Sequence, residues 1–196
     1  MPLPLLWAGA AILGVATIKK LSDDRQNHDG LRHALDTTHT RDRLDHHDSG
    51  VAKFPGEVFV NEMPATVRPG ALVCCGLGNV LDHTGILIDD DIIVELHGSG
   101  LIKAISAERF LHERSGQDIF VACDSHGEAL ADELTAERAS QQIYQYQSYH
   151  LIRNNCHRFA WQCISGFKDD VTTFYELNKR LSKRFDRKIY WDKWHR

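Results

Sequence analysis

Positive charge is scarce in this chain, which has 23 lysines and arginines against 27 aspartates and glutamates in 196 residues and a net charge of −4. A nucleic-acid-binding protein usually has a basic excess, so this balance argues against nucleic acid as a partner of the whole chain.

The cysteines are few and poorly arranged for disulfides. There are five cysteines, an odd number, with no CxxC pair and with Cys74 next to Cys75. This pattern argues against a disulfide framework and favours reduced thiols in a cytosol-facing compartment.

The N-terminal segment lacks charged side chains, because none precedes Lys19. The apolar run at residues 2–18 is short for a spanning helix, which needs about 20 residues. It also lacks the positive side chains that precede the apolar run of a signal peptide. Lys19 and Lys20 follow the run, which by the positive-inside tendency places the body of the protein in the cytoplasm. We therefore predict that residues 1–21 form a hydrophobic membrane-anchor helix that spans the bilayer or lies on it. A cleaved signal peptide is the alternative.

Residues 22–50 are highly polar, and no internal repeat is visible in the chain. Five histidines lie in this segment among alternating carboxylates and arginines: His28, His33, His39, His46 and His47. Their spacing follows no recognised metal-ligand pattern, so we interpret the segment as a solvated tether rather than a metal site.

The globular part begins near Val51, and its pattern predicts strands first and helices afterwards. A Pro69-Gly70 turn precedes a buried strand in VRPGALVCCGL, and two β-rich runs joined by three aspartates indicate a hairpin. Beyond that turn, strands are predicted at residues 83–88, 92–96 and 118–123, and helices are predicted at residues 128–147 and 156–164. This order predicts an α+β fold, with a small antiparallel sheet packed on helices.

The C-terminal segment, residues 168–196, is basic and amphipathic. Its apolar positions fall on one helical face: Phe174, Leu177, Leu181 and Phe185. Such a segment can lie on an anionic membrane surface, or its apolar stripe can pack on the domain while its lysines stay in water. We treat residues 51–167 as the catalytic domain and residues 168–196 as a separate tail.

The stretch RNNCHRFAWQC places a cysteine directly after two asparagines, at a predicted helix start. Asparagine is a good N-cap, so Asn155 is predicted to cap the helix that Cys156 opens. Unpaired N–H groups and the positive end of the helix dipole favour a thiolate there. Cys156 is therefore a candidate nucleophile, with a small buried hydrophobe as the alternative.

A thiol nucleophile needs a base, and the base needs a partner that orients its ring. His83 opens an apolar strand of the predicted hairpin, and Glu95 and His97 share one face of the returning strand. Either could orient His83, and we favour Glu95, because a carboxylate in the apolar setting IIVEL needs a partner. His157 lies next to Cys156 and should point about 100° away on a helix, which makes it a poor base.

Three segments taken in order resemble the lecithin:retinol acyltransferase (LRAT) group: PGALV, DHTGILIDDDIIVEL and NNCHRFAWQCISG. That group belongs to the circularly permuted, NlpC-type branch of the papain-like cysteine hydrolases. The resemblance spans residues 67–167 and implies a circularly permuted papain-like fold. Two features depart from the family pattern. The Glu-His pair that follows the family's cysteine is here His157-Arg158, and the third triad position, commonly histidine in vertebrate members, falls on Glu95.

The resemblance implies a thiol acyltransferase or hydrolase in which Cys156 forms an acyl-thioester. His83 would act as the general base and Glu95, or alternatively His97, would orient it. Such chemistry requires no metal and no organic cofactor. The expected function is a membrane-anchored acyltransferase or phospholipase acting on lipid acyl esters. The alternatives are an NlpC-type amidase or peptidase and a non-catalytic anchored binding module. Cys163, near the same helix face as Cys156, is expected to be a spectator.

Overall fold

The computed structural model describes residues 64–77, 81–112, 114 and 118–196. Six strands form one antiparallel sheet in the order β4-β3-β2-β1-β5-β6. The strands are β1 (Leu72–Leu77), β2 (Leu81–Asp89), β3 (Ile92–Leu96), β4 (Ile102–Ser106), β5 (Phe120–Cys123) and β6 (Tyr190–Lys193). The helices in these residues are α3 (Ala107–Leu111), α4 (Glu133–Ser140), α5 (Cys156–Ser165) and α6 (Phe174–Phe185). The class is α+β with a small antiparallel sheet, as the sequence predicted.

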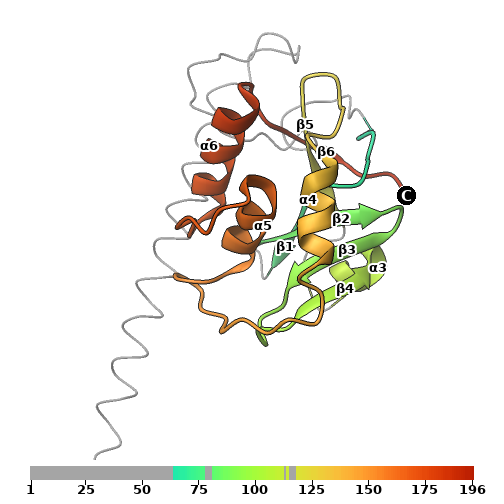
Figure 1. Cartoon of the computed structure of the whole chain (residues 1–196). Coiled ribbons are helices and arrows are strands. Elements are labelled where there is room, and N and C mark those ends of the chain that lie inside the picture. The colour runs from blue at the N-terminus through green and yellow to red at the C-terminus, as the bar shows by residue number, and fades with distance from the viewer. Residues whose placement is uncertain (1–63, 78–80, 113, 115–117) are drawn as a thin grey trace, which may run out of the picture.

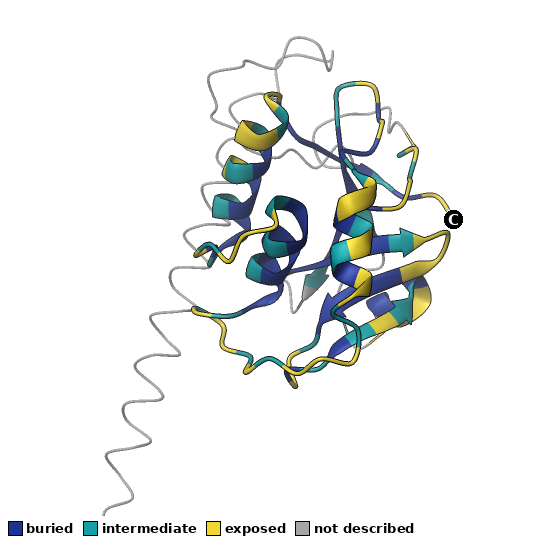
Figure 2. Ribbon diagram, viewed as in Figure 1, coloured by how far each residue is buried: buried dark blue, intermediate teal, exposed yellow. Residues whose placement is uncertain are grey.

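The sheet separates two apolar cores. On one face, α4, α5 and α6 cover the sheet, and the core contains residues such as Leu72, Ile86 and Phe159. On the other face, α3 packs through Phe110 against residues such as Val73. The buried positions of the ribbon follow the sheet and the inner sides of the helices (Figure 2). This arrangement places α5 against strands β2 and β3.

The predicted hairpin and the turn before the first strand are both present. Strands β2 and β3 pair in antiparallel register, with Ile86 opposite Val94 and Leu87 opposite Ile93. The turn at Gly70 has a positive φ of 91°, and a Cβ there would lie 2.0 Å from the carbonyl oxygen of Asp132. Only glycine combines that backbone conformation with so close an approach, which explains the glycine of the predicted turn.

The prediction of a helix over residues 128–147 was wrong in extent, because α4 is only eight residues long. Its start is fixed by Asp132, whose carboxylate accepts a hydrogen bond from the backbone N–H of Thr135. Before it, Ala129 bridges to Cys123, the last residue of β5. After it, Tyr144 adopts a positive φ of 68° and donates its N–H to the carbonyl of Ile102. Pairing with strands therefore replaces helix at both ends.

The C-terminal segment is part of the domain rather than a separate tail, so the boundary expected between residues 167 and 168 divides one packed unit. Strand β6 pairs with β5 and completes the sheet. Helix α6 buries Phe174, Leu177 and Leu181, and the fully buried indole of Trp191 donates to the side chain of Asn178 at 2.9 Å. The apolar stripe packs on the domain, which was the second of the two interpretations of this sequence.

The predicted anchor helix at residues 1–21 and the tether at residues 22–50 lie outside the described residues. In the part of the chain that the structure describes, no helix is long and apolar enough to cross a bilayer.

The packing of Trp191 predicts that the last strand is essential for stability. Trp191→Ala should destabilise the protein by about 3–5 kcal/mol, because it removes a buried indole and leaves the Asn178 side chain without its donor. Phe167→Ala is a matched control, since Phe167 is 71% exposed and its loss should change the stability by less than about 0.5 kcal/mol. Urea denaturation followed by circular dichroism measures both. Equal midpoints for the two variants would contradict this account of the C-terminal segment.

Candidate functional site

The start of α5 is built around Asn155, as predicted. Asn155 is the N-cap, and its side-chain oxygen accepts a hydrogen bond from the N–H of Arg158 at 3.1 Å. Its amide nitrogen donates to the carbonyl of Leu151 at 2.8 Å and to that of Thr172 at 2.6 Å. The buried amide therefore ties the preceding loop and the segment before α6 to the helix. Cys156 is the first helical residue and is almost completely buried.

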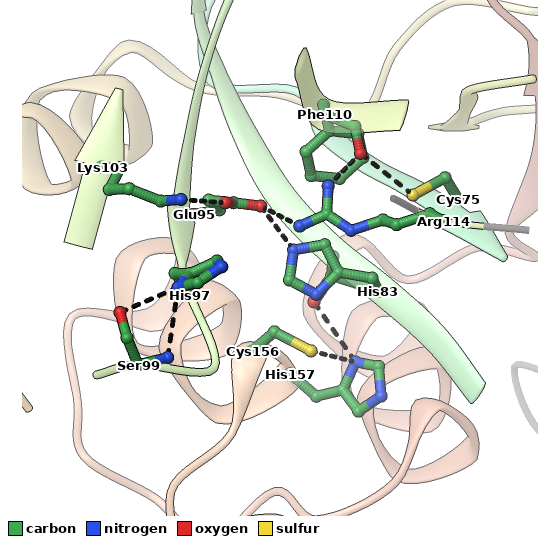
Figure 3. Close-up of polar contacts among 11 residues, drawn as sticks. Cys75, His83, Glu95, His97, Ser99, Lys103, Phe110, Arg114, Cys156 and His157 are labelled. Carbon is green, nitrogen blue, oxygen red and sulfur yellow. Dashed lines mark hydrogen bonds and ion pairs between the residues drawn. The ribbon is translucent and has the colours of Figure 1, made fainter. Parts of the chain in front are cut away.

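His83 and Glu95 are brought together by the hairpin. His83 Nε2 lies 2.7 Å from Glu95 Oε2, and both side chains are buried (Figure 3). Because a carboxylate only accepts hydrogen bonds, Nε2 carries the proton and donates it to Glu95. This hydrogen bond fixes the orientation of the imidazole and leaves Nδ1 as the ring atom available to another group.

His97, the alternative partner of His83, is held elsewhere. Its Nδ1 lies 2.8 Å from the hydroxyl of Ser99 and accepts the N–H of Ser99 at 3.1 Å, in the turn that follows β3. Of the two candidate orienting residues, Glu95 is therefore the one in contact with His83.

Two cations that the sequence analysis did not identify complete the surroundings of Glu95. Arg114 Nη2 lies 2.6 Å from Glu95 Oε2, and Lys103 Nζ lies 3.5 Å from Oε1 (Figure 3). Lys103 is the register partner of Glu95 on β4. Arg114 also donates to the carbonyl of Phe110 and stacks over its ring at 4.9 Å from the centroid. The alternation of β4 could have indicated Lys103, whereas no sequence signal indicated Arg114.

The carboxyl group of Glu95 is ionised in this setting. Burial alone would raise its pKa, but the hydrogen bond and charge of His83 and the guanidinium of Arg114 outweigh burial and lower the pKa of Glu95 to about 2. The carboxylate is therefore a fixed negative charge that stabilises a positive charge on His83.

His157 contradicts the prediction that it points away from Cys156. Its Nδ1 lies 3.9 Å from Cys156 Sγ and 3.2 Å from the hydroxyl oxygen of Thr84 on β2. The ring is buried and packs against Phe174, with centroids 5.7 Å apart. The helical offset of adjacent residues separates their Cβ atoms, but the imidazole is long enough to turn back to the thiol, and contacts from two other elements hold it there.

Cys156 is under the electrostatic influence of two imidazoles. Burial raises the pKa of a thiol, yet the charges of His157 and His83 and the contact of His157 with the sulfur lower the pKa of Cys156 well below its ordinary value. Conversely, burial lowers the pKa of both histidines, but the neighbouring thiolate outweighs it and raises the pKa of each. The arrangement favours a thiolate with imidazolium neighbours. Burial, together with the negative charge of Cys156, raises the pKa of the Tyr149 phenol.

The other thiols whose pKa is shifted differ from Cys156 in direction. Burial raises the pKa of Cys75 to about 12 and that of Cys163 to about 12. Cys163 lies in the core and accepts a weak hydrogen bond from the side chain of Gln142 at 3.6 Å. Its surroundings fit the predicted spectator.

No group of three or more histidines, cysteines, aspartates or glutamates in the described ranges is arranged to hold a metal ion. The five histidines of the tether lie outside these ranges. Comparison with known proteins gave no family model that matches the chain and no similar curated protein.

The ion pairs of Glu95 predict a strong effect of Glu95→Gln on stability. The variant should lose about 3 kcal/mol near pH 6, because it leaves the buried Arg114 and His83 charges without their counter-ion. Since the pKa of Glu95 falls from 4.5 to about 2 on folding, its contribution is present above pH 4.5 and is lost as the pH falls towards 2. The stability difference between wild type and variant in urea should shrink over that window. A difference that stays constant down to pH 2 would contradict the assignment.

The two contacts of His157 predict that it helps to keep Cys156 ionised. His157→Asn retains a neutral donor near the position of Nδ1, and His157→Phe retains a ring against Phe174. Both should slow alkylation of Cys156 by iodoacetamide about ten-fold near pH 6, with little change near pH 9, because each removes a positive charge beside the sulfur. Peptide mass mapping at each pH measures the rate. Superimposable pH profiles of wild type and both variants would show that His157 has no electrostatic effect on the thiol.

Proposed function

We propose that the protein is a cysteine-dependent acyltransferase or hydrolase with a Cys-His-Glu triad. The observation that carries the proposal is the convergence of Cys156, His83 and Glu95 in one buried cluster, with the thiol pKa lowered and the imidazole held by an ionised carboxylate. Nothing in packing requires a thiol, an imidazole and a carboxylate to be buried together, and burying them is unfavourable unless they interact. Acyl transfer through a thioester uses all three.

In the proposed reaction, the thiolate of Cys156 attacks the carbonyl carbon of an acyl ester. The carbonyl electrons move to oxygen, and the backbone N–H of Cys156 at the start of α5 is a suitable donor to that oxyanion. When the tetrahedral intermediate collapses, the bond to the leaving alkoxide breaks, and the imidazolium of His83 donates its Nδ1 proton to the leaving oxygen. Glu95 keeps the ring oriented and stabilises its charge. An acyl-thioester on Cys156 remains.

In the second half of the reaction, His83 accepts a proton from water, an alcohol or an amine as that acceptor attacks the thioester. Water gives a free acid and a hydrolase, whereas an alcohol or amine gives a transferase. The second tetrahedral intermediate collapses with cleavage of the bond between carbon and sulfur. Cys156 leaves as the thiolate and His83 keeps the proton, which restores the starting thiolate and imidazolium with no other reactant.

We assign the chain to the LRAT-like group and its fold to the circularly permuted, NlpC-type branch of the papain-like hydrolases. Support comes from the order of the elements: the histidine is on β2, the carboxylate is on the next strand and the cysteine opens a later helix beside the same sheet. The segments PGALV and NNCHRFAWQCISG contribute to this assignment.

The proposed substrate is a lipid acyl ester presented at a membrane. The apolar sequence of residues 2–18, followed by Lys19 and Lys20, supports an anchored protein with its catalytic domain in the cytoplasm. The same triad could cleave amides, so an NlpC-type amidase or peptidase is the competing enzyme. A non-catalytic binding module is the competing non-enzyme.

The test is turnover of phosphatidylcholine vesicles by the full chain, with trapping of the acyl-thioester by intact mass and its release by hydroxylamine. Cys156→Ala should abolish both the thioester and the release of fatty acid, and His83→Ala should lower the rate by about 10²–10⁴-fold. Cys163→Ala is the matched control and should retain the rate, because Cys163 has no part in the reaction.

Three outcomes would contradict the proposal in different ways. Cleavage of peptide amides in place of lipid esters would favour the amidase. Turnover that survives Cys156→Ala would remove the thioester mechanism. Alkylation of Cys156 no faster than that of Cys163 near pH 6, and unchanged by His83→Ala, would leave the non-catalytic module as the better account.

A further inference from the structure

A cavity of about 780 Å³ lies on the outer side of the Glu95 cluster. Strands β3 and β4, helix α3 and Arg114 form its walls. Its lining consists of Glu95, His97, Lys103, Ile105, Ser106, Glu108, Arg109, His112 and Arg114. The proposed reaction uses none of these residues except Glu95, so the cavity is a feature that the catalytic cluster alone does not explain.

The lining is rich in cations. Lys103, Arg109 and Arg114 contribute three positive charges, and the carboxylates of Glu95 and Glu108 contribute two negative ones. The carboxylate of Glu95 pairs with Arg114 and Lys103 as well as with His83, and it has no ion pair with Arg109. Three cations against two carboxylates leave the lining with an excess of one positive charge.

The two guanidinium groups of the lining, those of Arg114 and Arg109, differ in how they are held. Arg114 has a side chain that is only 9% exposed, and contacts with Glu95 and Phe110 fix its guanidinium. Arg109 is exposed on α3, and among the described residues its guanidinium has no hydrogen-bond or ion-pair partner. Its helix is anchored at the same place by the hydroxyl of Ser106, which accepts the N–H of Arg109 at 3.3 Å. A fixed buried guanidinium and an unpaired exposed one thus line the same space.

We propose that this cavity binds a phosphate-type oxyanion, with Arg109 and Lys103 as the principal ligands and Arg114 as a fixed positive charge behind them. Guanidinium and ammonium groups that converge on one cavity are suited to phosphate oxygens, and the forked donors of Arg109 can bind two of them. If the acyl ester substrate proposed above is correct, the anion is the phosphodiester of a lipid headgroup. A free phosphate is the other source of the same chemistry.

The experiment measures binding to the full chain carrying Cys156→Ala, which has no acyl chemistry, so its result does not depend on the proposed function. Inorganic phosphate and glycerophosphocholine are titrated separately by isothermal calorimetry at constant ionic strength. We expect saturable binding of at least one of them in the millimolar range, and a loss of affinity of about ten-fold in Arg109→Gln and in Lys103→Gln, since each removes a charge-assisted hydrogen bond.

Lys183→Gln is the matched control, because Lys183 is an exposed cation on α6 outside the cavity. This variant should bind phosphate and glycerophosphocholine with the same affinity as the Cys156→Ala parent. Tighter binding of glycerophosphocholine identifies the lipid headgroup as the source, and tighter binding of inorganic phosphate identifies the free ion; both agree with the proposal. Absence of saturation up to about 50 mM, or equal affinity in all three variants, would overturn it, since bidentate charged contacts bind more tightly than that.

Discussion

The candidate site depends on the ion pairs that the buried carboxylate of Glu95 forms with its neighbours. A lone ionised carboxylate in this position would be strongly unfavourable, and its three cationic neighbours come from three different segments: His83 from β2, Lys103 from β4 and Arg114 from the chain beyond α3. The strand order β4-β3-β2 brings Lys103, Glu95 and His83 side by side, so the order of the sheet sets the charges around the His83 imidazole. A shift of either neighbouring strand by one residue would turn its partner to the other face and leave the charge uncompensated.

The thiol is stabilised from a separate set of elements. Asn155 fixes the start of α5 through three hydrogen bonds, and His157 reaches the sulfur from the same helix while Thr84 on β2 contacts its ring. Cys156 therefore meets one imidazole that a carboxylate orients and another that a hydroxyl contacts. Two positive neighbours in a buried site counteract desolvation more effectively than one, because charge interactions are little screened there.

The Glu95 cluster joins the thiol site to the cationic cavity. Glu95 and Arg114 line the cavity and also surround His83, so a negatively charged ligand in the cavity and the protonation of His83 act on the same charges. In the proposed enzyme this geometry would couple recognition of a substrate's phosphate group to the state of the base. The departures of the sequence from the pattern of the LRAT group that it resembles lie at His157-Arg158 and at Glu95. Of these residues, His157 contacts Cys156 and Glu95 contacts His83.

The sequence by itself determined the α+β class, the β2–β3 hairpin, the asparagine cap and the cysteine at its helix start, and it indicated Glu95 or His97 as the partner of His83. These features follow from alternation, turn chemistry and capping, which depend on residues a few positions apart. Only the tertiary structure decided the roles of Arg114 and His157, the short extent of α4 and the inclusion of β6 in the sheet. Arg114 meets Glu95 across 19 positions and His157 meets Thr84 across 73, so both contacts depend on how distant segments pack. Local sequence periodicity does not predict such packing, because the packing depends on which charged groups are buried and paired in the folded chain.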